Sequence, residues 1–263
     1  MNSRAWLLTT AVMFAACQKV PITGRSQMNM VPESTMISMS LTNYKDYLKE
    51  HPPVSSGDAN YQLVSKVGNK IANAVKTYMA QQNLSDRIKG YAWEFNLVNE
   101  NTVNAWCMPG GKVVVYSGLL PITQSEQGLA VVLGHEIAHA IARHGSERMT
   151  QGLLVQLGGI GLSTAMSQKP KETQDLFNQS YGVTSTLGIL AYSRKQESEA
   201  DKMGLVFMAM AGYDPSQAIS FWERMAATGG TKPPEILSTH PSDASRIKAI
   251  KEYLPEAMKY YKK

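Results

Sequence analysis

The segment Gly134–His139, with the sequence Gly-His-Glu-Ile-Ala-His, most constrains what this chain can fold into. It continues the apolar run Leu129–Leu133, and this pattern predicts a helix buried in the core. Side chains four residues apart lie on one face of a helix, so His135 and His139 can direct two imidazole nitrogens at one point. Two neutral imidazoles at that spacing are typical of zinc binding. Glu136 lies about 100° around the helix from His135 and can act as a base on an activated water. The structural alternative is a buried helix with two hydrogen-bonded histidines.

Residues 1–16 have the organisation of an export signal. A short basic start precedes the apolar segment Ala5–Phe14, which is too short to span a bilayer. The small residues Ala15 and Ala16 before Cys17 resemble a bacterial lipobox, which predicts cleavage before Cys17 and lipidation of that cysteine. The alternative is an ordinary signal peptide cut nearby, with no role for Cys17. Cleavage at Cys17 would leave 263 − 16 = 247 residues, enough for one large domain with its own core.

Charge and cysteine content exclude some classes of function. The chain has 26 Lys and Arg against 21 Asp and Glu, a net charge of +5. This excess is too mild to indicate a nucleic-acid partner. If Cys17 is lipidated, Cys107 is the one remaining thiol, so an internal disulfide cannot form. Folding then depends on the apolar core and on any bound metal.

The hydrophobic pattern predicts an α+β fold that is mainly α, with a small β-sheet just before the active helix. Residues 17–57 are interpreted as a tether over 18–32 followed by a helix over 33–50. Strands are predicted at Trp93–Val98 and Lys112–Tyr116. Thr123 and Glu126 fit a capping box, which predicts that the active helix begins near Thr123 and ends near Gly145. Further helices are predicted over 59–80, 149–168 and 176–193 (as a helical hairpin), 203–211, after 214–215, and over 242–254.

Two histidines do not complete a catalytic zinc site, which needs a third protein ligand and an open position. One known pattern requires histidine at position 145, where this chain has Gly145, and we interpret His144 as a helix-end residue. The other pattern places a glutamate on a later helix.

The segment Arg194–Asp201 carries the candidate glutamates. Glu197 and Asp201 are four residues apart, so Glu197 could bind the metal while Asp201 accepts a hydrogen bond from the outer nitrogen of a ligand histidine. Glu199 lies about 200° around the helix from Glu197 and would face away. On spacing alone, a surface run of alternating charge remains an open alternative.

Three motifs together give the chain a family resemblance. HEIAHAIARHG at 135–145, S-R-x-x-E-x-E-A-D at 193–201 and T-H-P at 239–241 resemble the gluzincin peptidases related to the CAAX prenyl protease. Within that family the chain is most similar to the soluble bacterial outer-membrane lipoproteins. The segment 103–111 matches their N-A-F-A-x-P-G-G motif, with Trp106 and Cys107 as departures. The resemblance covers roughly residues 59–254.

The resemblance implies a zincin-like metallopeptidase domain over residues 58–263. It implies one zinc ion bound by His135, His139 and Glu197, with Glu136 as the general base. His240 would approach the site and stabilise the tetrahedral oxyanion.

Arg246 is expected to support this site. The expected function is a zinc metalloendopeptidase that acts on protein or peptide substrates, namely misfolded or unassembled envelope proteins, at the periplasmic face of the outer membrane. The alternatives are a chaperone or binding module with little turnover, and a structural metal site, which would favour four protein ligands.

The strand Lys112–Tyr116 is expected to lie beside the zinc cleft. If it is a sheet edge, an extended substrate can pair with it as a further strand. Asn104, Val113, Val114 and Val115 are the residues expected to hold substrate. The alternative is an interior strand with both edges already paired.

Overall fold

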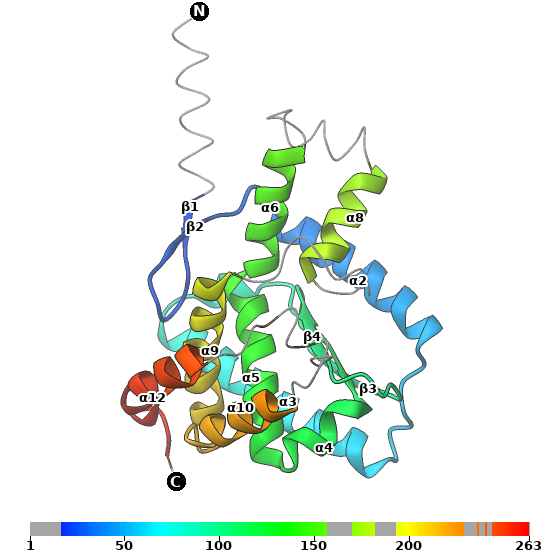
Figure 1. Cartoon of the computed structure of the whole chain (residues 1–263). Helices are drawn as coiled ribbons and strands as arrows, with labels where there is room; N and C mark the ends of the chain where they lie inside the picture. The colour runs from blue at the N-terminus through cyan, green and yellow to red at the C-terminus, as the bar shows by residue number, and fades with distance from the viewer. Residues whose placement is uncertain are drawn as a thin grey trace, which may run out of the picture.

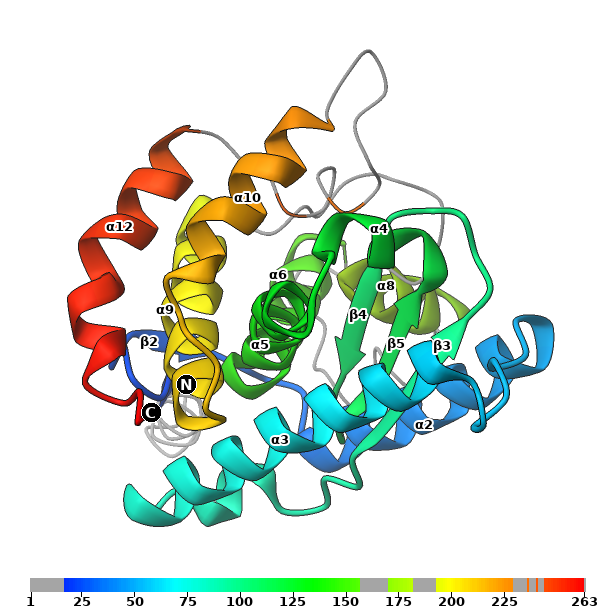
Figure 2. The same ribbon diagram turned by 90° about the horizontal axis from the view of Figure 1, so that it is seen from below.

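Helix α5 (Glu126–Ala142) is the central element of the structure, and it is buried throughout from Gly128 onward. The computed structural model of the chain describes residues 17–156, 170–181, 193–228, 236, 240 and 244–262. Within them, helices surround α5 and a three-stranded sheet lies on one side of it (Figures 1 and 2). The predicted class, an α+β fold that is mainly α, is confirmed.

Four helices build the wall around α5. Helices α3 (Ala59–Gln81), α9 (Arg194–Met210) and α10 (Gln217–Ala227) contact α5, and α12 (Ala244–Met258) packs against α9. The start of α3 is explained by Asp58, whose side chain accepts hydrogen bonds from two backbone amides of the first turn. The buried residues of these helices join α5 in one apolar core.

The sheet consists of β3 (Glu94–Val98), β4 (Ala105–Met108) and β5 (Lys112–Tyr116) in the order β3–β5–β4. Strand β5 is therefore the interior strand, parallel to β3 and antiparallel to β4. The prediction that β5 offers a free edge to substrate is wrong, and so is the substrate role of Val113, Val114 and Val115 that depended on it. All three valines are fully buried, because side chains on both faces of this strand are covered.

Strand β4 was not predicted as a strand, and it is the strand nearest α5 (Figure 2). Tyr116 N–H donates to the Asn104 carbonyl at 3.1 Å, so in this antiparallel register Ala105 and Cys107 direct their backbone groups away from β5. The Asn104 side-chain oxygen accepts the Ala105 N–H at 2.8 Å. Asn104 therefore covers part of the outer edge of β4, and its contact with substrate stays a prediction.

Both ends of α5 differ from the expected positions. The N-cap is Ser125, whose hydroxyl accepts the Gly128 N–H at 3.1 Å, and Thr123 instead ends the short helix α4 (Leu120–Thr123). The prediction of a capping box from Thr123 to Glu126 is wrong. Gln124 between them adopts a left-handed conformation, φ 59°, which ends α4 before α5 begins. At the other end Arg143, φ 60°, ends α5 and α6 (His144–Gln156) begins.

The N-terminal segment is a β-hairpin, so the prediction of a tether over residues 18–32 is wrong. Strands β1 (Cys17–Lys19) and β2 (Ser26–Met28) pair antiparallel, and the helix α2 (Glu33–Glu50) follows as predicted. Val20 and Val31 are buried, so apolar contacts fix this segment to the domain. The predicted signal peptide, residues 1–16, lies outside the described residues.

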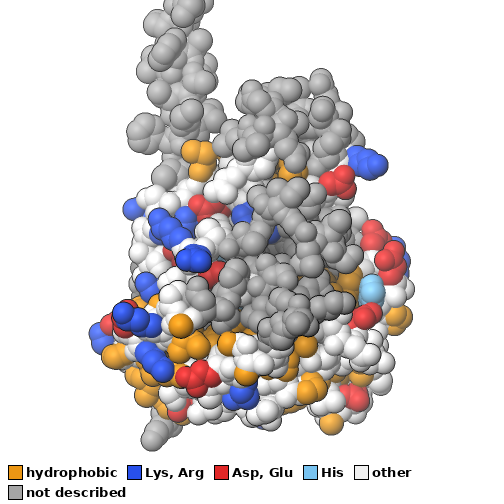
Figure 3. All heavy atoms as spheres, viewed as in Figure 1, with side chains coloured by type: hydrophobic (Ala, Val, Ile, Leu, Met, Phe, Trp, Pro, Cys, Tyr) orange, Lys and Arg blue, Asp and Glu red, His pale blue; other side chains and the backbone are white. Residues whose placement is uncertain are grey.

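Helix α6 packs against α8 (Pro170–Tyr181), so two neighbouring helices are present as predicted. Their bounds differ from the predicted 149–168 and 176–193, since α6 begins at His144 and α8 begins at Pro170. Residues 157–169 and 182–192 of the predicted hairpin lie outside the described residues. No helix in the described part of the chain has both the length and the hydropathy to cross a bilayer. On the described part of the face in Figure 3, basic and acidic side chains lie interspersed. The absence of a nucleic-acid partner stays a prediction.

Two glycines bring the backbones of α5 and α9 into contact. A Cβ placed on Gly134 would lie 2.9 Å from the Gly204 carbonyl oxygen, and a Cβ on Gly204 would lie 2.9 Å from the His135 backbone nitrogen. Only residues without a side chain allow this approach, which sets how closely the two helices can cross.

We predict that Gly204→Ala destabilises the protein although alanine is the better helix former. The added methyl would force the backbones apart at a cost of about 1–3 kcal/mol, against an intrinsic helix gain of about 1 kcal/mol. Urea unfolding in the presence of a chelator measures the change. Ser38→Ala on the exposed face of α2 is the control and should not lower the midpoint. An unchanged midpoint for Gly204→Ala would contradict the close crossing.

Candidate metal centre

Four buried side chains direct ligand atoms at one point. His135 and His139 from α5, Glu197 from α9 and His240 offer atoms that all lie within 4.8 Å of one another. The Nε2 atoms of the two α5 histidines are 3.0 Å apart, and Glu197 Oε1 is 3.3 Å from His139 Nε2. The structure thus brings together the three ligands expected from the sequence.

The chemistry of this cluster suits a divalent metal ion. Imidazole nitrogens and a carboxylate oxygen are the donors that zinc uses in proteins. Glu197 Oε2 is buried and lies 3.2 Å from Arg246 Nη1 and 3.4 Å from His135 Nε2 without a hydrogen bond of good geometry. Glu136 Oε1 is also buried and accepts no hydrogen bond among the described residues; its ionic contact is His240 Nε2 at 3.5 Å. Buried carboxylate oxygens without a hydrogen bond are rare because their desolvation is costly, and a metal ion among the ligand atoms would offset part of that cost.

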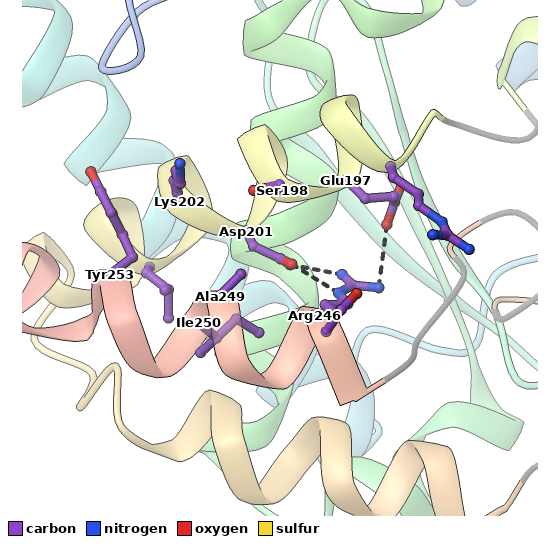
Figure 4. A pocket seen from close by; sticks show the side chains of 11 residues that line it. Glu197, Ser198, Asp201, Lys202, Arg246, Ala249, Ile250 and Tyr253 are labelled. Carbon is purple, nitrogen blue, oxygen red and sulfur yellow. Dashed lines mark hydrogen bonds and ion pairs between the residues drawn. The ribbon is translucent and has the colours of Figure 1, made fainter.

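Asp201 and Arg246 hold His135 from outside the cluster. Asp201 Oδ1 lies 2.9 Å from His135 Nδ1, and Arg246 donates to both Asp201 oxygens at 2.8 and 2.7 Å (Figure 4). The Arg246 guanidinium also lies 3.4 Å from the centre of the Trp222 ring. Burial would raise the pKa of Asp201, but Arg246 and His135 outweigh it and hold that pKa below its ordinary value. A charged Asp201 keeps the proton of His135 on Nδ1 and leaves Nε2 for the metal.

The residues that hold His139 were not predicted from the sequence. His144 Nδ1 lies 2.9 Å from His139 Nδ1, and His144 Nε2 lies 2.9 Å from Glu199 Oε2. His144 is completely buried and is not in the last turn of α5, and Glu199 is buried although it points away from the metal ligands. The spacing of five residues between the two histidines gave no helical signal, because the left-handed Arg143 turns the chain between them.

Glu136 lies beside the cluster and not in it. Burial raises the pKa of the Glu136 carboxyl above its ordinary value, although His240 and His135 act against this. A raised pKa is the direction required of a general base that works near neutral pH.

His240 places its Nδ1 atom among the ligand atoms of the metal site, whereas an oxyanion donor would face the substrate. Its Nδ1 is 2.9 Å from Glu197 Oε1 and 3.2 Å from His135 Nε2, whereas its Nε2 is 3.5 Å from Glu136 Oε1. In this arrangement His240 could complete a set of four protein ligands. The oxyanion role implied by the family resemblance is the alternative to this fourth position.

Comparisons with known proteins agree with this site. The model of peptidase family M48 matches residues 65–254, which include every residue of the cluster. The mitochondrial metalloendopeptidase OMA1 of Schizosaccharomyces pombe is 34% identical over 246 residues, covering 93% of this chain and 68% of that protein. The human mitochondrial metalloendopeptidase OMA1 is 30% identical over 262 residues, covering 96% of this chain and 49% of that protein.

A bacterial relative is also similar. The beta-barrel assembly-enhancing protease of Escherichia coli is 28% identical over 213 residues, covering 78% of this chain and 41% of that protein. Because mitochondrial and bacterial proteins both match, similarity does not single out the outer-membrane lipoprotein branch. The family match covers most of the chain, and the relatives are named as metalloendopeptidases or a protease. The chain therefore belongs to peptidase family M48, a family of zinc metallopeptidases.

Proposed function

We propose that this protein is an endopeptidase that hydrolyses peptide bonds with one zinc ion held by His135, His139 and Glu197. The observation that carries the proposal is the buried convergence of these three donors beside Glu136. Zinc at this position would supply a Lewis acid that polarises the scissile carbonyl and makes water more acidic.

The residues of the chain then have distinct roles. Glu136 Oε1, which accepts no hydrogen bond among the described residues, would take a proton from the attacking water and pass it to the leaving amine. Asp201, fixed by Arg246, would hold the proton on His135 Nδ1. A binding module would need none of these proton transfers, so the presence of Glu136 favours turnover over chaperone activity alone.

We further propose that the substrates are misfolded or unassembled proteins of the bacterial envelope. This is supported by the predicted export signal in residues 1–16 and by the similarity to a bacterial protease whose name links that protein to β-barrel assembly. Unfolded casein is a suitable generic substrate for a first assay.

We predict that Glu136→Gln retains zinc but loses turnover, and that His139→Ala loses both. Removing a general base commonly costs about 10²–10⁴-fold in rate, whereas removing a ligand empties the site. Metal content of the purified proteins and casein cleavage with and without a chelator separate the two variants. Near-normal cleavage by Glu136→Gln, or full zinc content in His139→Ala, would contradict these roles.

We predict that His240→Ala retains zinc and cleaves casein at or above the wild-type rate. A zincin needs one open position for turnover, and His240 Nδ1 lies among the ligand atoms, where it would fill that position. Initial rates at equal zinc content measure the effect. A fall of about 10²–10³-fold, the usual cost of a lost oxyanion donor, would instead support the role implied by the family resemblance.

We propose that Cys17 carries the lipid that holds the protein on the periplasmic face of the outer membrane. Cys17 directly follows the predicted export signal and begins strand β1. We expect Cys17→Ser to take up no labelled fatty acid and to appear in the soluble periplasmic fraction. A membrane-bound Cys17→Ser protein would show that another segment anchors the chain.

A further inference from the structure

The N-terminal hairpin makes a network of ionic contacts that ends at the metal centre. Arg25, between β1 and β2, donates from Nε to Glu199 Oε2 at 2.7 Å. Its two terminal nitrogens donate to the two carboxylate oxygens of Glu147 at 2.7 and 2.8 Å. The Thr23 hydroxyl donates to Glu199 Oε1. Arg25 thereby joins the hairpin to α6, which carries Glu147, and to α9, which carries Glu199.

The hydrogen bonds between this network and His139 allow one arrangement of protons. His139 Nε2 points into the cluster and needs its lone pair for a metal, so its proton lies on Nδ1. That proton is donated to His144 Nδ1, and His144 must then carry its own proton on Nε2. His144 Nε2 donates this proton to the Glu199 carboxylate. The hydrogen bond to Glu199 therefore favours the tautomer of His139 that carries its proton on Nδ1 and leaves the Nε2 lone pair free for a metal.

The two ligand histidines are supported in the same way. Behind His135, Asp201 accepts the Nδ1 proton and Arg246 holds the carboxylate. Behind His139, His144 connects the ligand to the Glu199 carboxylate. The arginine that holds this carboxylate is Arg25, which comes from the N-terminal hairpin and not from a helix. Sequence similarity to the family motifs did not indicate this second support, because Arg25 lies outside the matched residues 65–254.

We propose that Arg25 is a positioning residue for His139 and that the N-terminal hairpin is a structural part of the metal centre. The proposal rests on the zinc site proposed above. Without the guanidinium, the largely buried carboxylates of Glu147 and Glu199 would repel each other with no cation between them. Glu199 would then turn away from His144, and His139 would lose the partner that fixes its tautomer and ring orientation.

The test is the zinc affinity of the purified full-length protein, measured by competition with a chromophoric chelator. We expect Arg25→Ala to weaken zinc binding by about 10–100-fold, the usual effect of losing an outer partner of a ligand histidine. Arg25→Lys keeps the charge but loses the forked geometry, so it should fall between wild type and Arg25→Ala. The absorption spectrum of the cobalt-substituted protein should change in Arg25→Ala, because it reports the geometry of the ligands.

Two further variants separate positioning from general stability. Arg87→Ala is the matched control, since Arg87 joins the hairpin to α5 through the Lys19 and Ile141 carbonyls but makes no hydrogen bond to Glu199 among the described residues. It should leave the zinc affinity and the cobalt spectrum unchanged. Circular dichroism in the presence of a chelator shows whether each variant folds. If Arg25→Ala does not fold, Thr23→Val replaces it in the test, because it removes a single donor to Glu199.

Each outcome decides one of the two proposals. A wild-type protein that binds no zinc would overturn the proposed function itself. A wild type that binds zinc, with folded Arg25→Ala and Thr23→Val proteins within twofold of its affinity, would overturn the positioning role of Arg25. An equal loss in Arg87→Ala would also overturn it, because the effect would then come from hairpin docking in general.

Discussion

The contact between Gly134 and Gly204 is the constraint on which the metal centre depends. It allows the α5 and α9 backbones to approach to a distance that any side chain at either position would prevent. His135 follows Gly134 directly, and Glu197 lies about two helical turns before Gly204. The close crossing of the two helices therefore determines the distance between the histidines of α5 and the carboxylates of α9. The surrounding apolar core holds both helices in that position.

A second constraint on the structure is that several carboxylates around the metal site are buried. Unpaired charges are costly in a core, so each ligand histidine is supported by a carboxylate and each of these carboxylates by an arginine. Arg246 from α12 and Arg25 from the hairpin provide these cations from opposite ends of the chain. Glu136 is the exception, with one oxygen that accepts no hydrogen bond among the described residues. An oxygen with only a 3.5 Å ionic contact, to His240 Nε2, suits a group that must take and return a proton during the reaction.

The sheet places β4 beside α5 and keeps its most apolar strand, β5, in the interior. Strand β5 pairs on both sides, and its valines pack alternately into two separate apolar clusters. Strand β4 lies between β5 and α5, so its outer edge is the edge of the sheet nearest α5 (Figure 2). Burial raises the pKa of the Cys107 thiol on this strand, and the Glu136 carboxylate raises it further, which reflects how near the strand lies to the reacting groups.

Features that depend on residue spacing within one helix could be predicted without the fold. The spacing of the α5 histidines and the position of Glu136 follow from helix geometry, and helices α2 and α3 follow from apolar periodicity. Glu197 was assigned through the family resemblance, because its spacing from Asp201 is equally compatible with a charged surface helix. The partners of His139 could be identified only from the folded chain, because His144 and Glu199 are on different helices and Arg25 is in a hairpin remote in sequence from both. The interior place of β5 was also undecided, since a buried valine run is compatible with an edge or an interior position until its neighbours are known. The ends of α5 were missed because two non-glycine residues, Gln124 and Arg143, adopt left-handed backbone conformations, which are uncommon for such residues and leave no sign in the hydrophobic pattern.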